Sequence, residues 1–417
     1  MGGAGVNGAM AVRYIPLDLK HAATPKIEHL ATLAGLEAAV RGILIAVWPL
    51  YLYEMLGDAQ AVSVAYLFGG VLSLVTGLMV PWLTRFVPRR WAYTTGCLLY
   101  VLGAAMAFLE SDLGAHLALL FSMMATATVF VCFNAYVLDY VARENLGRSQ
   151  SVQMAYAAAP WTLGPLLGPF VFAWLGAGIF VISGGFAVLL LVVFWVLRLG
   201  NGKQIQRARG PAVNPLGFLG RFFRQPRLIA GWFFAVMRSC GWWVYVVYLP
   251  IFCIEAGLGD MVGSTALAVS NAVLFLAPAI NRWARRAGVR RSVRLAFLGC
   301  AALMIAASLL AFFPWGTVAL MFCSSAFLVT LDVVGGLPFL MSVKPSERTE
   351  MSAVYSSFRD VSGILTPAMA WAVLFVVPLQ GIFAAAGLGL LVAWGIAGRL
   401  HPRLGAERPS RGGMMEA

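Results

Sequence analysis

The chain has 417 residues, of which 61% are hydrophobic and only 11% charged, and its mean hydropathy is +0.83. This composition excludes an ordinary soluble globular domain and predicts a polytopic membrane protein. A net charge of +13 would suggest nucleic-acid binding in a soluble protein. In a membrane protein, basic residues in short loops set the topology and touch anionic head groups, so we expect membrane lipids and no nucleic acid as partners.

Apolar stretches long enough to cross a bilayer, which takes about 20 residues as a helix, recur along the chain. We place twelve helices at 30–56, 61–84, 91–109, 116–141, 150–174, 177–198, 228–255, 262–283, 292–313, 316–342, 351–377 and 380–398. The Gly-, Pro- and Arg-rich connection 199–227 divides them six and six. The predicted fold class is therefore all-α, with two six-helix bundles at 30–198 and 228–399, a cytoplasmic linker at 199–227, and cytoplasmic ends at 1–29 and 400–417.

Lysine and arginine occur on one side of these helices only. The joints after even-numbered helices carry the basic residues Arg85, Arg89, Arg90, Arg143, Arg148, Arg282, Arg286, Arg290, Arg291, Arg294, Lys344 and Arg348, besides those of the linker. The odd-to-even joints, such as 57–60, 110–116 and 256–263, have none. By the positive-inside rule both termini are cytoplasmic. Short loops without large domains are typical of a multi-pass protein of the bacterial cytoplasmic (inner) membrane, and residues 1–29 lack the apolar stretch of a signal peptide, so we expect the first helix to direct insertion.

Cysteine and histidine usage argues against metal or catalytic chemistry. The six cysteines lie in apolar stretches without metal-ligand spacing, and the four histidines lie outside or at the ends of the predicted spans. The loops are short, and the chain has no phosphate-binding loop. We therefore expect no metal, no cofactor, no ATP-driven pump and no enzyme.

The two halves repeat one another at an offset of 201 residues. Rare residue types coincide in the pairs Pro49 and Pro250, Glu54 and Glu255, Trp82 and Trp283, Arg85 and Arg286, Arg89 and Arg290, and Arg90 and Arg291. Parallel repeats of this kind predict two bundles related by an axis along the membrane normal, with a substrate site between them near mid-depth.

Four segments resemble motifs of the major facilitator superfamily. Residues 77–96 resemble its loop between helices 2 and 3, and 280–291 echo that loop in the second half. Residues 138–150 resemble the cytoplasmic end of its helix 4, and 161–169 (WTLGPLLGP) resemble the helix 5 motif associated with antiporters. The acid of the first loop and the helix 4 arginine of drug–proton antiporters are missing. The resemblance implies a monomeric transporter of the same fold, whose helices 1, 4, 7 and 10 line a central cavity.

On this fold, charged residues inside the spans become candidate site residues. Arg41 and Arg238 fall on helices 1 and 7, Asn134 on helix 4 and Asp332 on helix 10, all in one layer on the cytoplasmic side of mid-depth. Two guanidiniums in one cavity would bind a carboxylate or phosphate, as a similar arginine pair does in the family's organophosphate exchangers. We therefore predict Arg41, Arg238 and Asn134 as substrate-binding residues. Tyr245, seven residues after Arg238, completes this set, because it should share its helix face.

An alternative is that each arginine is already neutralised inside its own bundle. Glu37 and Arg41 are spaced i, i+4 and fall on one helix face, and Arg238 could pair with Asp332. A carboxyl group that gains or loses such a partner can also carry a proton. We predict Glu37, Asp332 and Asp360 as proton-coupling residues. Arg359 also lies in the layer, but its neighbour Asp360 points about 100° away from it.

A last group of residues is predicted to act in gating. The resemblance implies that Asp139 pairs with Arg85 or Arg89 when the cavity is closed to the cytoplasm, with Arg286 as the echo in the second half. In helix 5, Gly164, Pro165 and Gly168 permit close helix approach and a bend, which would shape the contact between the bundles; an ordinary kinked helix is the alternative.

The function predicted from these residues is secondary active transport of a small solute by alternating access, coupled to protons. The arginines favour uptake or exchange of an organic anion, whereas the helix 5 motif favours efflux by proton antiport. One alternative is a multidrug-type proton antiporter for lipophilic compounds. Another is a receptor or assembly factor that keeps the transporter fold without transport.

Overall fold

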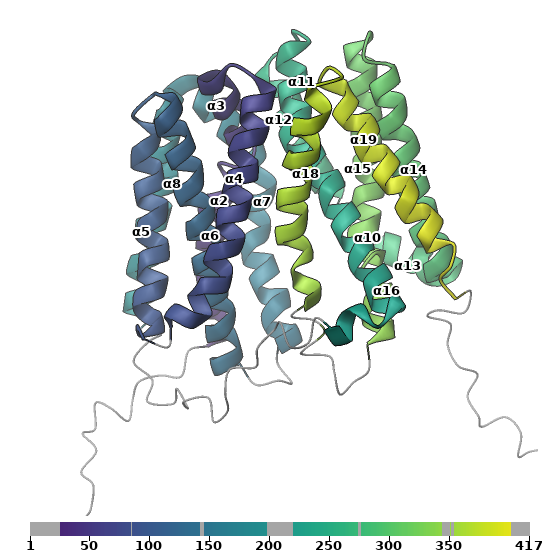
Figure 1. Cartoon of the computed structure of the whole chain (residues 1–417). Helices are drawn as coiled ribbons and strands as arrows, with labels where there is room; N and C mark the ends of the chain where they lie inside the picture. Colours follow the sequence, from purple (N-terminus) through teal and green to yellow (C-terminus); the bar gives the residue numbers. More distant parts are fainter. Residues whose placement is uncertain are drawn as a thin grey trace, which may run out of the picture.

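The computed structural model describes residues 26–84, 86–141, 146–197, 220–273, 277–343, 351 and 354–401. These residues form helices joined by short turns, with no β-strand among them (Figure 1). Eight helical segments are long and apolar enough to cross a membrane. The all-α membrane fold is therefore confirmed, while the count of twelve spans, the domain boundaries and the cytoplasmic location of both ends stay predictions.

The helices of the first half are α2 (Ile27–Gly42), α3 (Val47–Leu56), α4 (Ala59–Leu83), α5 (Arg89–Ala107), α6 (Asp112–Tyr140), α7 (Leu146–Leu175), the short 3₁₀ turn η2 (Gly176–Gly178) and α8 (Ile179–Val196). Those of the second half are α10 (Pro226–Trp243), the π-helical segment η3 (Val244–Tyr248), α11 (Leu249–Glu255), α12 (Asp260–Ala272), α13 (Ala277–Ala287), α14 (Val289–Leu309), α15 (Pro314–Val334), α16 (Leu337–Ser342), α18 (Phe358–Leu374) and α19 (Gln380–Ala397).

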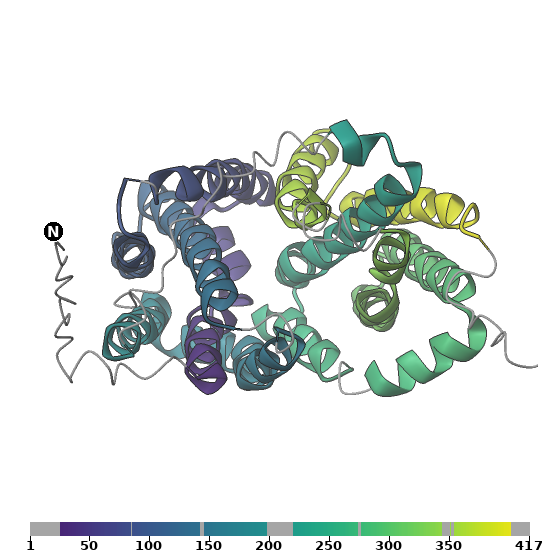
Figure 2. The ribbon, with the colours of Figure 1, turned by 90° about the horizontal axis from the view of Figure 1, so that it is seen from below.

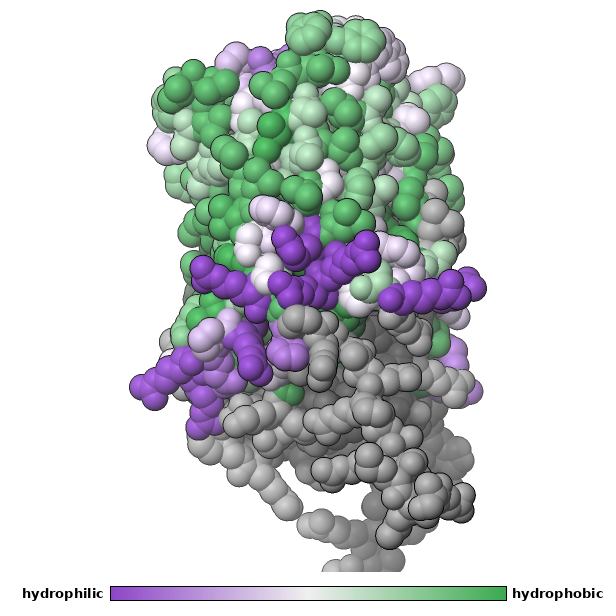
Figure 3. Space-filling model, turned by 90° about the vertical axis from the view of Figure 1, so that its right-hand side faces the viewer, coloured by the Kyte–Doolittle hydropathy of each residue, from purple (hydrophilic) through white to green (hydrophobic). Residues whose placement is uncertain are grey.

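These elements gather in two groups, which Figure 2 shows side by side: α2 to α8, the amino-terminal bundle, and α10 to α19, the carboxy-terminal bundle. The bundles meet where α4 packs on α18, α7 on α12, and α3 on α11. We call the end at which α2 begins and α19 ends the inner end, because it is predicted to be cytoplasmic. The opposite end is the outer end (top in Figure 1). An apolar belt covers most of the face seen in Figure 3, and hydrophilic side chains gather toward its inner end.

The first helix of each bundle is interrupted at the same place in the repeat. A turn over residues 43–46 separates α2 from α3, and the π-helical segment 244–248 separates α10 from α11, which matches the offset of 201 residues. Pro49 and Pro250 follow the two interruptions. Because a proline has no N–H and its ring crowds the carbonyl four residues earlier, a regular α-helix cannot continue through this stretch. The predicted repeat is therefore visible in the backbone.

The glycines of the helix 5 motif bring α7 onto α2. A methyl group added at Gly164 would collide with the backbone of Gly42, and one added at Gly168 would collide with the carbonyl of Ile43. The expected close approach is present, and its partner, which the sequence did not identify, is α2; that a bend here shapes the contact between the bundles stays a prediction. These glycines face the first helix of their own bundle, since α2 and α7 pack along their length, and they do not form the contact between the bundles.

Candidate functional site

The predicted arginine layer lies beside the two helix interruptions. Arg41 is two residues before the turn at 43–46 and near the middle of the span Ile27–Leu56, and Arg238 is six residues before the π-helical segment. Helix 1 begins at Ile27 rather than at residue 30, and the depth of Arg41 in the membrane stays a prediction. The irregular backbone therefore lies where the sequence predicts substrate to bind.

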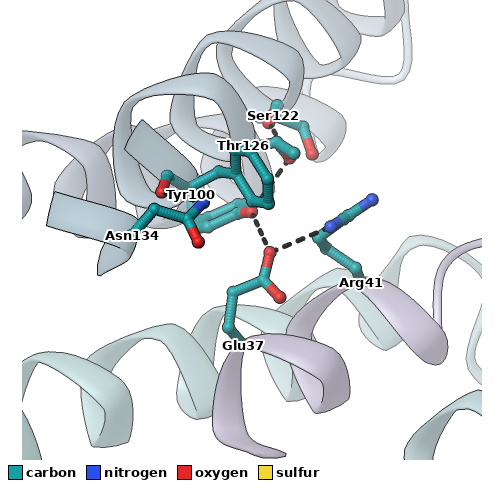
Figure 4. A network of polar contacts seen from close by, with 7 residues as sticks. Glu37, Arg41, Tyr100, Ser122, Thr126 and Asn134 are labelled. Carbon is teal, nitrogen blue, oxygen red and sulfur yellow. Dashed lines mark hydrogen bonds and ion pairs between the residues drawn. The ribbon is translucent and has the colours of Figure 1, made fainter. Parts of the chain in front are cut away.

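Arg41 belongs to a polar network inside the amino-terminal bundle (Figure 4). Its Nη1 lies 3.1 Å from Oε1 of Glu37, one helical turn earlier. The Tyr100 hydroxyl donates to the same carboxylate oxygen at 3.4 Å and hydrogen-bonds the Thr126 hydroxyl at 2.9 Å. The guanidinium also lies 5.2 Å from the ring centroid of Trp161 on α7. The alternative in which Glu37 neutralises Arg41 is therefore present, although 36% of the Arg41 side chain remains exposed.

Arg238 forms the corresponding pair in the carboxy-terminal bundle. Its Nε lies 3.2 Å from Oδ1 of Asp332, and the Trp242 indole N–H donates to Oδ2 at 2.9 Å. Phe358 packs 5.3 Å from the guanidinium. The predicted alternative pairing with Asp332 is thus present as well. Trp242 was not predicted as a site residue. The repeat aligns it with Arg41 and so could have identified it.

Arg359 brings a third guanidinium to this layer. It is exposed at the start of α18, and the ring of Phe358 lies 5.7 Å from its guanidinium and 5.3 Å from that of Arg238. Its guanidinium lies 5.4 Å from the ring of Phe130 on α6 of the opposite bundle. Among the described residues it forms no ion pair with a carboxylate, and Asp360, the next residue, is half-buried without one. Arg41 and Arg238 therefore each have a carboxylate within ion-pair distance, whereas Arg359 has none in the part of the chain that the structure describes.

The other two predicted substrate-binding residues differ in burial. Tyr245 is fully buried inside the carboxy-terminal bundle, where its hydroxyl hydrogen-bonds Ser270 at 2.7 Å, and Ser270 in turn hydrogen-bonds Ser325 at 2.8 Å. Its ring lies 5.9 Å from that of Trp242, which bonds to the Asp332 partner of Arg238, but its hydroxyl faces Ser270. Asn134 is exposed on α6 beside the Glu37 network (Figure 4), and its amide donates to the Phe130 carbonyl at 3.0 Å rather than to a group near Arg41.

The charged gating residues that the structure describes lie at the inner ends of the bundles. Arg89, the first residue of α5, forms an ion pair with Asp139 near the end of α6, while the gating role of this pair stays a prediction. Its counterpart in the repeat, Arg290, donates instead to the Gly398 carbonyl at 2.6 Å. Both contacts join helices of one bundle. Arg286 is exposed on α13, and Arg85 lies outside the described residues.

The fold resembles those of solved transporters. The nucleoside transporter NupG superposes with a TM-score of 0.70 at 14% sequence identity, over 90% of this chain and 99% of that one. A POT family transporter in complex with a thioalcohol-conjugated peptide has a TM-score of 0.70 at 12% identity, over 89% and 94% of the two chains. A bacterial homologue of the iron transporter ferroportin in an inward-facing state has a TM-score of 0.65 at 15% identity, over 89% and 97%. At such identities the likeness shows the fold alone.

Sequence comparison supplies the family. None of the curated proteins matches the chain. The family model described as Major Facilitator Superfamily, however, matches residues 30–367, which is well over half of the chain. The two bundles, the repeated interruption of their first helices and this match agree with the resemblance carried by the sequence motifs. The chain is therefore a multi-pass membrane transporter that belongs to the Major Facilitator Superfamily.

Proposed function

We propose that the protein is a secondary transporter that moves a small organic anion across a bacterial cytoplasmic membrane by alternating access. The observation that supports this proposal most is that Arg359, which contacts the same Phe358 ring as Arg238, lacks an ion-paired carboxylate among the described residues, whereas Arg41 and Arg238 each have one. A charge inside the membrane is costly unless it has a partner or a function. An anionic substrate is the partner that this arrangement lacks.

The aromatic groups around the arginines suit the organic part of such a substrate. Trp161 lies on Arg41, Phe358 on Arg238, and Phe130 on Arg359. Planar guanidiniums bind carboxylates through paired hydrogen bonds and stack on aromatic faces. We propose that the carboxylate of the substrate bridges Arg359 and one of the paired arginines, while its apolar part lies among these rings.

The two ion pairs, Glu37 with Arg41 and Asp332 with Arg238, suggest a way to couple transport to protons. An anion that takes Arg41 or Arg238 as its partner releases Glu37 or Asp332 from that guanidinium. A carboxyl group without a cationic partner in an apolar site takes up a proton more readily. We propose that Glu37 and Asp332, with Asp360 as a third candidate, bind protons together with the anion, so that anion and proton move in the same direction.

The second candidate function is efflux of lipophilic compounds by proton antiport. The helix 5 motif at 161–169 and the aromatic groups around the site favour it. Such a compound would bind without Arg359 and would compete with protons for the site, whereas an anion would bind together with them. The two candidates thus differ in their dependence on Arg359 and in the direction of proton flow.

A thermal-stability screen of the purified protein tests the proposal. The panel contains benzoate, succinate and glycerol phosphate, with tetraphenylphosphonium and a neutral dye as lipophilic probes. We expect a small carboxylate to raise the melting temperature of the native protein and of Arg227→Ala, an exposed arginine on the same helix as Arg238, but not of Arg359→Ala. Stabilisation by tetraphenylphosphonium alone, retained in Arg359→Ala, would overturn the anion proposal in favour of the efflux candidate.

A further inference from the structure

The middle of α7 contains a backbone carbonyl that its own helix cannot satisfy. Pro165 has no N–H, so it cannot donate to the carbonyl of Trp161, four residues earlier. An unsatisfied carbonyl inside a membrane protein is costly, and a neighbouring helix usually supplies the missing donor. The donor here is the side-chain amide of Asn271, whose Nδ2 lies 3.0 Å from the Trp161 oxygen.

This hydrogen bond crosses from one bundle to the other. Asn271 lies near the inner end of α12 in the carboxy-terminal bundle, and Trp161 lies halfway along α7 in the amino-terminal bundle. The repeat aligns Asn271 with Gly70 of α4, where the other bundle contact, between α4 and α18, is made. A methyl group added at Gly70 would lie only 2.6 Å from the Gly363 carbonyl, so backbones touch there without a side-chain donor. The amide of Asn271 is therefore not part of the repeat but specific to the α7–α12 contact.

Trp161 connects this bond to Arg41. Its ring lies 5.2 Å from the Arg41 guanidinium. On either side of it, Pro160 and Gly164 pack on the backbone of Gly42, the residue after Arg41; a methyl group at Gly42 would lie 2.6 Å from the Pro160 carbonyl. Contacts this close leave α2 and α7 no room to slide past each other. A movement of α12 that pulls on the Trp161 carbonyl therefore acts on the segment that holds Arg41.

We propose that Asn271 is a positioning residue that replaces the helical hydrogen bond removed by Pro165 and thereby holds the Arg41 segment to the carboxy-terminal bundle in this conformation. Tyr53 with Glu255 and Ser63 with Tyr248 hydrogen-bond across the outer half of the bundle contact, at 3.3 and 2.9 Å. The conformation is therefore one in which the outer ends are joined. A rotation of the bundles that opens the outer end would separate α7 from α12. The hydrogen bond from Asn271 to the Trp161 carbonyl would then break. The bond favours the outer-closed state whatever the solute is, so the proposal stands apart from the anion function.

Spin labels across the outer end test this proposal. The labels are attached at Gln60→Cys on α4 and Met261→Cys on α12, which occupy equivalent positions of the repeat in opposite bundles. The six native cysteines are replaced beforehand, so that only these two positions react. Double electron–electron resonance in nanodiscs then gives the ratio of outer-open to outer-closed protein. We expect Asn271→Ala to raise this ratio about fivefold, which corresponds to the loss of one ordinary hydrogen bond. No change in the ratio would overturn the proposal.

A double-mutant comparison separates this role from a general loss of packing. Pro165→Ala gives Trp161 a helical donor, so Asn271→Ala should then change the ratio by less than about twofold. Pro169→Ala is the matched control, because it restores a donor to the carbonyl of residue 165 and not to that of Trp161; in that background the effect of Asn271→Ala should persist. The proposal would be refuted if Asn271→Ala changed the ratio equally in the native protein, in Pro165→Ala and in Pro169→Ala.

A second pair of variants serves if Pro165→Ala does not fold. Asn271→Gln keeps a donor and should preserve the ratio of outer-open to outer-closed protein, whereas Asn271→Leu should raise it. The same ratio for both variants would contradict the role of Asn271.

Discussion

At the scale of single residues, the site consists of charged side chains. Some pair with a near neighbour in the sequence and others with a distant residue. The Glu37–Arg41 pair follows from i, i+4 spacing, and the sequence also suggested Arg238 with Asp332. Trp242 and Trp161 were not predicted, because an indole that donates to a carboxylate or stacks on a guanidinium looks in sequence like any apolar residue of a span. Arg359 was predicted in the same layer but not as a site residue, since its contact with Phe130 depends on how the bundles meet.

The Arg238–Asp332 pair gives a residue-scale prediction. Removing one member of such a pair leaves a charge without its partner, whereas replacing both by apolar residues of similar size removes the need for either. We expect Arg238→Met and Asp332→Leu each to lower the melting temperature of the detergent-purified protein, and the double variant to be more stable than either single variant. Additive losses in the double variant would show that the two side chains are not coupled.

At the scale of elements, the sequence predicted where helices lie better than how they are shaped. Apolar stretches and basic joints predicted the helices, and the offset of the repeat paired Pro49 with Pro250. The turn at 43–46 and the π-helical segment after α10 were not predicted, because a proline marks a break without stating which irregular backbone replaces the helix. The partner of the glycines in α7 was likewise unknown, since small residues permit close approach to any neighbour.

The contact between α2 and α7 gives an element-scale prediction. A methyl group at Gly164 would collide with the backbone of Gly42, which cannot move aside as a flexible side chain can. We expect Gly164→Ala to destabilise the protein by about 1–3 kcal/mol, the usual cost of overpacking a core. Gly185→Ala on α8 is the matched control, because no atom lies within 4 Å of its added methyl group; it should be neutral or stabilising. Chemical denaturation in detergent measures both, and equal effects would contradict the close packing.

At the scale of the whole molecule, two bundles meet around the layer that contains the three arginines. The internal repeat and the family resemblance predicted the two bundles, and the Major Facilitator Superfamily match confirms the family. The sequence did not predict that the outer ends are joined, because both conformations of an alternating-access protein share one sequence. Contacts such as Ser63 with Tyr248 lie across the two halves and become visible only when the bundles are placed together.

Uptake into proteoliposomes tests the central claim, proton-coupled transport of an anion bound by this layer, most directly. The measurement follows the radiolabelled carboxylate that stabilises the protein best, with an inward proton gradient. We expect accumulation that a protonophore abolishes, that persists in Arg227→Ala, and that is lost in Arg359→Ala. Accumulation unaffected by Arg359→Ala, or movement of the anion against the direction of the protons, would contradict this claim.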